Sequence, residues 1–184
     1  MDDAQKSGKR GFTLLEMLVV IAIIGILASI GVMNLNARMN QEAVKGAAMS
    51  LGSFLDRVSA DTRARSDTLS LLVSGKALIV YDSSSCAGTE LYRDSLAERT
   101  RFLTSAPTAL PSNSGIPALN WSTASNACLH FRPRIGLNAL VDTGYFQIQS
   151  THADDIRALV GKSSTNNRIQ SFRSNDGGAT WGKL

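Results

Sequence analysis

The 184-residue sequence predicts an α+β fold in which one long N-terminal helix packs on an antiparallel β-sheet head. Three observations support this prediction. An uncharged, apolar run extends from Met17 to Met33, a helical period of apolar residues continues from there to Val58, and short β-rich runs begin after Ser66. Residues 67–184 are therefore expected to form a single β-rich globular head, without a second domain or an internal repeat.

The apolar run has the dimensions of a membrane-spanning helix. Residues 12–33 number 22, which at ~1.5 Å per residue gives a helix of about 33 Å, enough to cross a hydrocarbon core of ~30 Å. Lys6, Lys9 and Arg10 precede this run, and the positive-inside tendency would keep them in the cytoplasm. The pattern predicts one membrane pass with a cytoplasmic N-terminus.

Glu16 lies inside this apolar run, where a plain membrane anchor has no use for it. A charge at the bilayer centre costs roughly 3 kcal/mol, although a glutamate at the membrane interface, close to water, would be tolerated. A cleaved secretory signal peptide also fits poorly, because its apolar core has about 7 to 15 residues and ends in a small-residue cleavage site. Position alone therefore leaves the interface and a specific role for Glu16 as alternatives.

The stretch GFTLLEMLVVIAIIGILASIG resembles the N-terminal signature of type IV pilins and of the pseudopilins of type II secretion. In that family a short basic leader ends in glycine and is cut before an aromatic residue, usually phenylalanine, and the fifth residue of the mature chain is glutamate. The resemblance implies that residues 1–11 are the leader, that prepilin peptidase cuts between Gly11 and Phe12 and N-methylates Phe12, and that Glu16 is the fifth-position glutamate. Major pilins commonly carry proline where this chain has Met33, so a proline kink is not expected.

The same resemblance implies a function in assembly. After cleavage, Glu16 of one subunit can pair with the new α-amino group of Phe12 in a neighbour, which neutralises two charges in apolar surroundings. The chain would wait in the bacterial inner membrane with its head in the periplasm or outside the cell. It would then join other pilins or pseudopilins in a type IV pilus or a type II secretion pseudopilus, served by an inner-membrane assembly platform.

Residues 34–66 are expected to continue the helix as an amphipathic segment. Apolar residues recur there every three or four positions, with charged residues largely between them. The small residues Gly46 and Gly52 would let another element approach the helix closely. The apolar stripe consists of Leu35, Met39, Ala43, Ala47, Leu51, Leu55 and Val58.

Strand patterns follow the helix. Two β-rich runs, residues 69–74 and 77–82, flank Gly75 and Lys76 and predict a tight hairpin. Later runs at ELYRD, RTRFLT, CLHFRPR, GYFQIQS, IRALVG and RIQSFRS predict an antiparallel sheet, and residues 105–120, which hold three of the four prolines, predict a surface loop. The stretch RVSADTRARSDTLSLLVSG also resembles H-type minor pseudopilins and T-type minor pilins, which implies a minor subunit.

The two cysteines, Cys86 and Cys128, are expected to form a disulfide. They lie 42 positions apart, and the two histidines, His130 and His152, stand apart without a partner ligand, so a metal site is not expected. A disulfide across this loop could add about 4 kcal/mol under the chain-entropy model. It would also require an oxidising compartment, which agrees with an exported head.

The C-terminal stretch SNDGGATW resembles the Asp-box of sialidase propellers, S-x-D-x-G-x-T-W. In propellers the motif recurs once per blade, whereas this chain has it once, so the resemblance implies a structural hairpin and not a glycosidase. The residues that match the motif are Ser174, Asp176, Gly178, Thr180 and Trp181.

The net charge of +4 and the pI of 9.3 raise the alternative of a DNA-binding minor pilin for natural transformation. Scattered charge on a solvated surface is the simpler interpretation. The candidate phosphate-binding residues are Arg132, Arg134, Arg157, Lys162, Arg168, Arg173 and Lys183.

The sequence holds neither a nucleophile elbow, nor a phosphate-binding glycine loop, nor a metalloprotease motif, so neither an enzyme nor a cofactor is expected. An alternative from another class is a signal-anchored binding protein that never polymerises.

Overall fold

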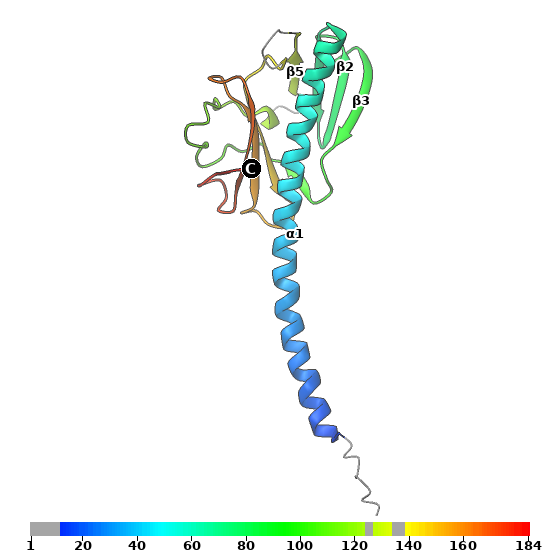
Figure 1. The fold of residues 1–184 in the computed structure, drawn as a ribbon, viewed down its shortest axis with the longest axis vertical. Coiled ribbons are helices and arrows are strands. Elements are labelled where there is room, and N and C mark those ends of the chain that lie inside the picture. The colour runs from blue at the N-terminus through cyan, green and yellow to red at the C-terminus, as the bar shows by residue number, and fades with distance from the viewer. Residues whose placement is uncertain (1–11, 124–126, 134–138) are drawn as a thin grey trace, which may run out of the picture. The chain divides into compact units, whose positions relative to one another are not determined.

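A computed structural model describes residues 12–123, 127–133 and 139–184. Within them the fold is α+β, as predicted. One helix of 52 residues, α1 (Leu14–Arg65), comes first and is followed by short antiparallel strands (Figure 1). The helix runs through the predicted apolar and amphipathic segments without interruption in its hydrogen-bonded structure.

The chain divides into two compact units, Met1–Arg38 and Met39–Leu184. In the first unit the large apolar side chains between Phe12 and Val32 whose placement is described are all exposed, from 44% for Val20 to 84% for Leu14. Among the described residues, no helix combines the length and the hydropathy needed to assign a membrane span.

The second unit contains the strands, which fall close to the predicted runs. The hairpin around Gly75 forms as predicted, with Ser74 opposite Ala77. The bounds are β1 (Leu69–Ser74), β2 (Ala77–Asp82), β3 (Thr89–Ser95), β4 (Thr100–Phe102), β5 (Ala127–Phe131), β6 (Gly144–Ser150), β7 (Arg157–Lys162), β8 (Ile169–Ser174) and β9 (Gly182–Lys183), with a short 3₁₀ helix, η1 (Trp121–Thr123), before β5.

The described strands form two antiparallel sheets, whereas the sequence predicted one. The first sheet has the order β3-β2-β1-β5 and the second has the order β4-β6-β7-β8-β9. The chain leaves the second sheet after β4, adds β5 to the edge of the first sheet beside β1, and returns to the second sheet as β6. Local sequence patterns identify strands but not their partners, and this crossing was therefore not predicted.

Both sheets contribute to one hydrophobic core together with the second half of α1. Leu55 and Val58 of the helix are fully buried, as are Leu71 of β1, Phe146 of β6 and Val160 of β7. Figure 1 shows the cyan part of α1 running along the strands of this unit. The helix residues of the core are Val44, Ala47, Ala48, Leu51, Phe54, Leu55 and Val58.

The buried stripe of the helix begins later than the sequence predicted. Leu35 and Met39, expected at its start, are 59% and 41% exposed, and burial becomes continuous only from Val44. Gly52 meets the expectation of close approach, because a Cβ at this position would lie 3.3 Å from Ser171 Oγ of β8. At Gly46 a Cβ would meet no atom within 4 Å, so this glycine has no such role in the described residues.

The proline-rich segment, residues 105–120, lacks regular structure as predicted, but it is not wholly on the surface. Ile116 is buried against Tyr145, Leu159 and Phe172 in a second, smaller apolar cluster. The side chain of Asn120 is also buried and donates hydrogen bonds to backbone carbonyls of this segment and the residues before it, beginning with Leu103 at 3.1 Å. The segment therefore covers the face of the second sheet that the helix leaves open.

Tyr92 fastens β3 to the last turns of α1. Its hydroxyl donates a 2.8 Å hydrogen bond to Asp61, and its ring lies under the guanidinium of Arg57, 4.9 Å from the ring centroid, and edge-on to Phe54. Burial, and then the hydrogen bond to Asp61, raise the pKa of Tyr92 well above its usual range. The neutral phenol is therefore the form that stabilises the folded head.

Because this pKa is higher in the folded state than in the unfolded state, the stabilisation is complete below about pH 10 and is lost as the pH rises further. We expect Tyr92→Phe to lower the free energy of unfolding at pH 7 and to flatten its fall above about pH 10. Chemical denaturation at several pH values measures both effects. Tyr81→Phe, which removes a tyrosine of the same sheet that lacks the Asp61 partner, should keep the fall of the wild type; an equal flattening in both variants would contradict this assignment.

Candidate functional site

The start of α1 is closed by a reciprocal pair of hydrogen bonds between Thr13 and Glu16. The Thr13 N–H donates to Glu16 Oε2 at 2.8 Å, and the Glu16 N–H donates to Thr13 Oγ1 at 3.2 Å. The Thr13 hydroxyl also donates to Glu16 Oε2 at 3.0 Å. This is a capping box, in which Thr13 is the N-cap and Glu16 the third helical residue, and it satisfies backbone donors that a helix start otherwise leaves unpaired.

The capping box gives Glu16 a partner that the sequence analysis missed. The pattern T-x-x-E before an apolar run was the signal that could have revealed it. Both hydrogen bonds to the carboxylate fall on Oε2. A carboxylate can accept about four hydrogen bonds, so the box leaves capacity for a further donor.

The carboxylate lies at one end of an exposed apolar surface. Phe12 is 80% exposed, and Leu15 and Leu18, which lie before and after Glu16 in the first turns of the helix, are 73% and 57% exposed. An apolar surface of this extent is unusual for a protein that works alone in water and indicates an interaction with lipid or with other helices.

The N-terminal segment is the part of the chain that matches a known family model. Residues 6–32 match the prokaryotic N-terminal methylation motif. This is the signal of type IV pilins and pseudopilins, and it supports a precursor that is processed by prepilin peptidase. The match includes Gly11, Phe12 and Glu16, although Gly11 and the rest of the leader, residues 1–11, lie outside the described residues.

The pilin signal ends at residue 32 and does not include the head. No curated protein and no solved structure matches the chain. The α+β architecture, a long N-terminal helix on antiparallel strands, is nevertheless that of the pilin fold.

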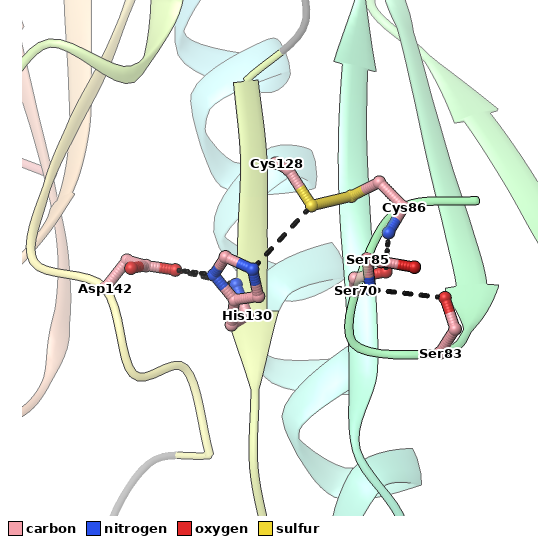
Figure 2. Close-up of a disulfide and its surroundings, with 7 residues drawn as sticks. All are labelled: Ser70, Ser83, Ser85, Cys86, Cys128, His130 and Asp142. Atoms are coloured by element: carbon pink, nitrogen blue, oxygen red, sulfur yellow. Dashed lines mark hydrogen bonds and ion pairs between the residues drawn. A yellow bond between two sulfur atoms is a disulfide. The ribbon is translucent and has the colours of Figure 1, made fainter. Parts of the chain in front are cut away.

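The predicted disulfide between Cys86 and Cys128 is present, with a Cα–Cα distance of 6.0 Å. Cys86 lies in the loop between β2 and β3, and its N–H donates a 2.9 Å hydrogen bond to Ser70 Oγ of β1. Cys128 lies in β5, so the bond ties an edge strand to a loop on the far side of β1 (Figure 2).

His130 has two partners in the structure, although the sequence predicted that it stands alone. Its Nε2 lies 3.9 Å from Cys128 Sγ, and Asp142 Oδ2 lies 3.1 Å from its Nδ1 and accepts its backbone N–H at 2.7 Å. Asp142 is distant in sequence and reaches His130 because Phe131 forms a bridge with Leu140. Within the described residues, no group of three or more His, Cys, Asp or Glu side chains could hold a metal ion.

The Asp-box-like stretch forms the predicted turn between β8 and β9. Ser174 Oγ donates to Asp176 at 2.6 Å and accepts the Gly178 N–H at 2.8 Å, while Asp176 accepts the Thr180 N–H at 3.0 Å and the Thr180 hydroxyl. Gly178 has a φ of +87°, a conformation that glycine adopts without strain. The Trp181 indole donates to the carbonyl of Ala109, so the turn also fastens the proline-rich segment.

Of the seven basic residues proposed for DNA binding, the six that the structure describes do not gather in one patch. Lys162 is 2% exposed and donates to the carbonyl of Leu140, so its charge is not presented at the surface. Its place at the end of a β-rich run gave no sign of this burial. Arg132 is exposed at the end of β5, and Arg134 lies outside the described residues.

Two more of these residues point to opposite faces of the second sheet. Arg157 lies opposite Ser174 and Arg173 opposite Ala158, and directly opposed residues share a face while neighbours along a strand alternate. The last two, Arg168 and Lys183, line a hollow of about 430 Å³ between β8 and α1.

The hydrogen bonds from Ser174, followed by those from Thr180, lower the pKa of Asp176 well below its usual range. The stabilisation from the carboxylate is therefore present above about pH 4 and is lost as the pH falls. We expect Asp176→Asn to lower the melting temperature at pH 7 and to make it less dependent on pH in the acid range. Calorimetry from neutral to acid pH tests this, with Asp82→Asn as a control carboxylate at a strand end; equal effects of the two substitutions would contradict the assigned role.

Proposed function

We propose that this chain is a minor pilin or pseudopilin subunit that prepilin peptidase matures by cutting between Gly11 and Phe12 and methylating Phe12. The match of residues 6–32 to the methylation motif carries this proposal. The mature subunit is held in the inner membrane and is then incorporated into a type IV pilus or a type II secretion pseudopilus. The assembly platform and the other pilins are its partners.

The uncovered first part of α1 supports a role in which helices pack against helices. Its apolar side chains surround the helix, as the exposure of the consecutive residues Val19, Val20 and Ile21 shows, because neighbours along a helix point about 100° apart. An apolar surface of this kind can exchange contact with lipid tails for contact with like helices without a large cost in free energy. A filament core built from such helices gives this surface its partner.

Glu16 supplies the polar contact in this assembly. Cleavage creates an α-amino group on Phe12, and its positive charge is a partner for the Glu16 carboxylate of an adjacent subunit. The capping box holds that carboxylate at the start of the helix through Thr13. A charge pair in apolar surroundings is strongly disfavoured when one partner is removed, so the pair favours one axial register between subunits.

Mass spectrometry of the mature chain tests the processing step. We expect the chain isolated from cells that contain prepilin peptidase to begin at N-methylated Phe12. A Gly11→Val variant should keep its leader, because the junction no longer has the residue that the peptidase signal requires. A mature wild-type chain that still begins at Met1 would contradict the proposal and favour a signal-anchored binding protein.

Glu16→Ala and Glu16→Val test the assembly step. Both variants should enter the membrane fraction normally but be incorporated into filaments several-fold less well, since the neighbour's amino group loses its partner. Filament yield is measured by shearing and immunoblotting, with total membrane-bound subunit as the reference. Glu42→Ala removes an exposed carboxylate from the same helix and should assemble normally; normal assembly of both Glu16 variants would show that the carboxylate has no such role.

A further inference from the structure

The disulfide of the head has different surroundings at its two sulfur atoms. Cys128 and His130 are two residues apart on β5, so their side chains lie on the same face of the strand. His130 Nε2 is 3.9 Å from Cys128 Sγ. Among the described residues, this is the one hydrogen-bonding contact made by either sulfur.

Asp142 holds the imidazole in this orientation. Its Oδ2 accepts the backbone N–H of His130 at 2.7 Å and lies 3.1 Å from His130 Nδ1. With Nδ1 turned to the carboxylate, Nε2 is the ring atom that faces the sulfur. The side chains of His130 and Asp142 are 38% and 34% exposed, so protons can exchange with water.

A sulfur, an imidazole and a carboxylate placed next to one another in this order form an arrangement that stabilises a thiolate. A protonated imidazole beside a sulfur favours its anionic form, and a carboxylate on the other ring nitrogen stabilises the imidazolium. The arrangement acts on Cys128 only. Cys86 is held instead through its backbone, by the hydrogen bond of its N–H to Ser70 Oγ.

We propose that Cys86–Cys128 is a thiol–disulfide exchange site with a fixed direction, in which an incoming thiol bonds to Cys86 and Cys128 is the sulfur that leaves. Exchange is faster when the leaving sulfur forms the more stable thiolate, and His130 provides that stability at Cys128. Access favours the same direction. Figure 2 shows the His130 ring on the side of the Cys128 sulfur that faces away from Cys86, where a thiolate attacking Cys128 in line would have to approach.

The exchange balances with one external dithiol. Its thiolate attacks Cys86 Sγ, a new sulfur–sulfur bond forms there, and the bond between Cys86 and Cys128 breaks. Cys128 leaves with the electron pair and takes a proton from His130. The second thiolate of the dithiol then attacks the dithiol's other sulfur in the mixed disulfide, and the bond from that sulfur to Cys86 breaks. Cys86 leaves with the electron pair and takes a proton from water, so the dithiol is oxidised and the protein disulfide is reduced.

The reverse reaction follows the same path. An oxidised dithiol would place its sulfur on Cys86, and Cys128, with its proton taken by His130, would be the nucleophile that closes the bond. The proposal is independent of filament assembly, because it concerns the formation and reduction of one bond in the head.

Regiochemistry with a monothiol tests the proposal directly. The full-length protein is treated briefly with reduced glutathione and quenched with acid, which stops exchange. The glutathione is then removed, the released protein thiol is labelled with N-ethylmaleimide, and the peptides are analysed by mass spectrometry. We expect glutathione on Cys86 and maleimide on Cys128 in about tenfold excess over the opposite pattern. An equal distribution, or glutathione mainly on Cys128, would overturn the proposal.

Variants then separate the imidazole from general effects on the loop. His130→Gln should bring the ratio close to one and slow reduction by dithiothreitol several-fold, while His152→Gln, at the other histidine, should leave both unchanged. Asp142→Asn tests the positioning residue and should reduce the ratio without abolishing it. The ratio is measured within each molecule, so it does not depend on yield, and a wild-type ratio in both His130→Gln and Asp142→Asn would exclude the assigned roles.

Discussion

The second half of α1 is the constraint on which the head depends. Two sheets share a single core with this helix, and Leu55 and Val58 of the helix lie fully buried in that core. The chain passes between the two sheets three times, from β3 to β4, from β4 to β5 and from β5 to β6. Without the helix residues between Val44 and Val58, the two sheets would lose the element that joins them in a common core.

The remaining links of the head secure strands at the edges of the two sheets. The disulfide fastens β5, an edge strand, across β1, and the Asp-box-like turn fastens the short strand β9 to β8. Edge strands with free hydrogen-bonding groups are sites of fraying and of unwanted pairing. The hydrogen bonds within the turn around Asp176 therefore serve to hold β9 beside β8. A single copy of the motif is consistent with this structural role in a hairpin.

Sequence reasoning succeeded where the information is local and failed where it depends on pairing. The hairpin of β1 and β2, the strand β6 and the turn at Asp176 follow from residue type and period, and each formed as predicted. The division into two sheets, the burial of Lys162 and the meeting of His130 with Asp142 depend on which segments lie together. Asp142 reaches His130 only because Phe131 pairs with Leu140, and neither strand pattern nor spacing contains that pairing.

Glu16 combines a local and a non-local requirement. As the third residue of a capping box it is explained entirely by Thr13 and the start of α1, and a helix of any protein could use it in this way. The cap alone does not explain the apolar surface beside Glu16. The side chains of Phe12, Leu15 and Leu18 are exposed there, and a helix cap does not require them. The cap fixes the carboxylate before a partner arrives, so less conformational entropy is lost when a neighbouring amino group binds. The helix cap and the proposed intersubunit pair are thus successive uses of one side chain, and the first prepares the second.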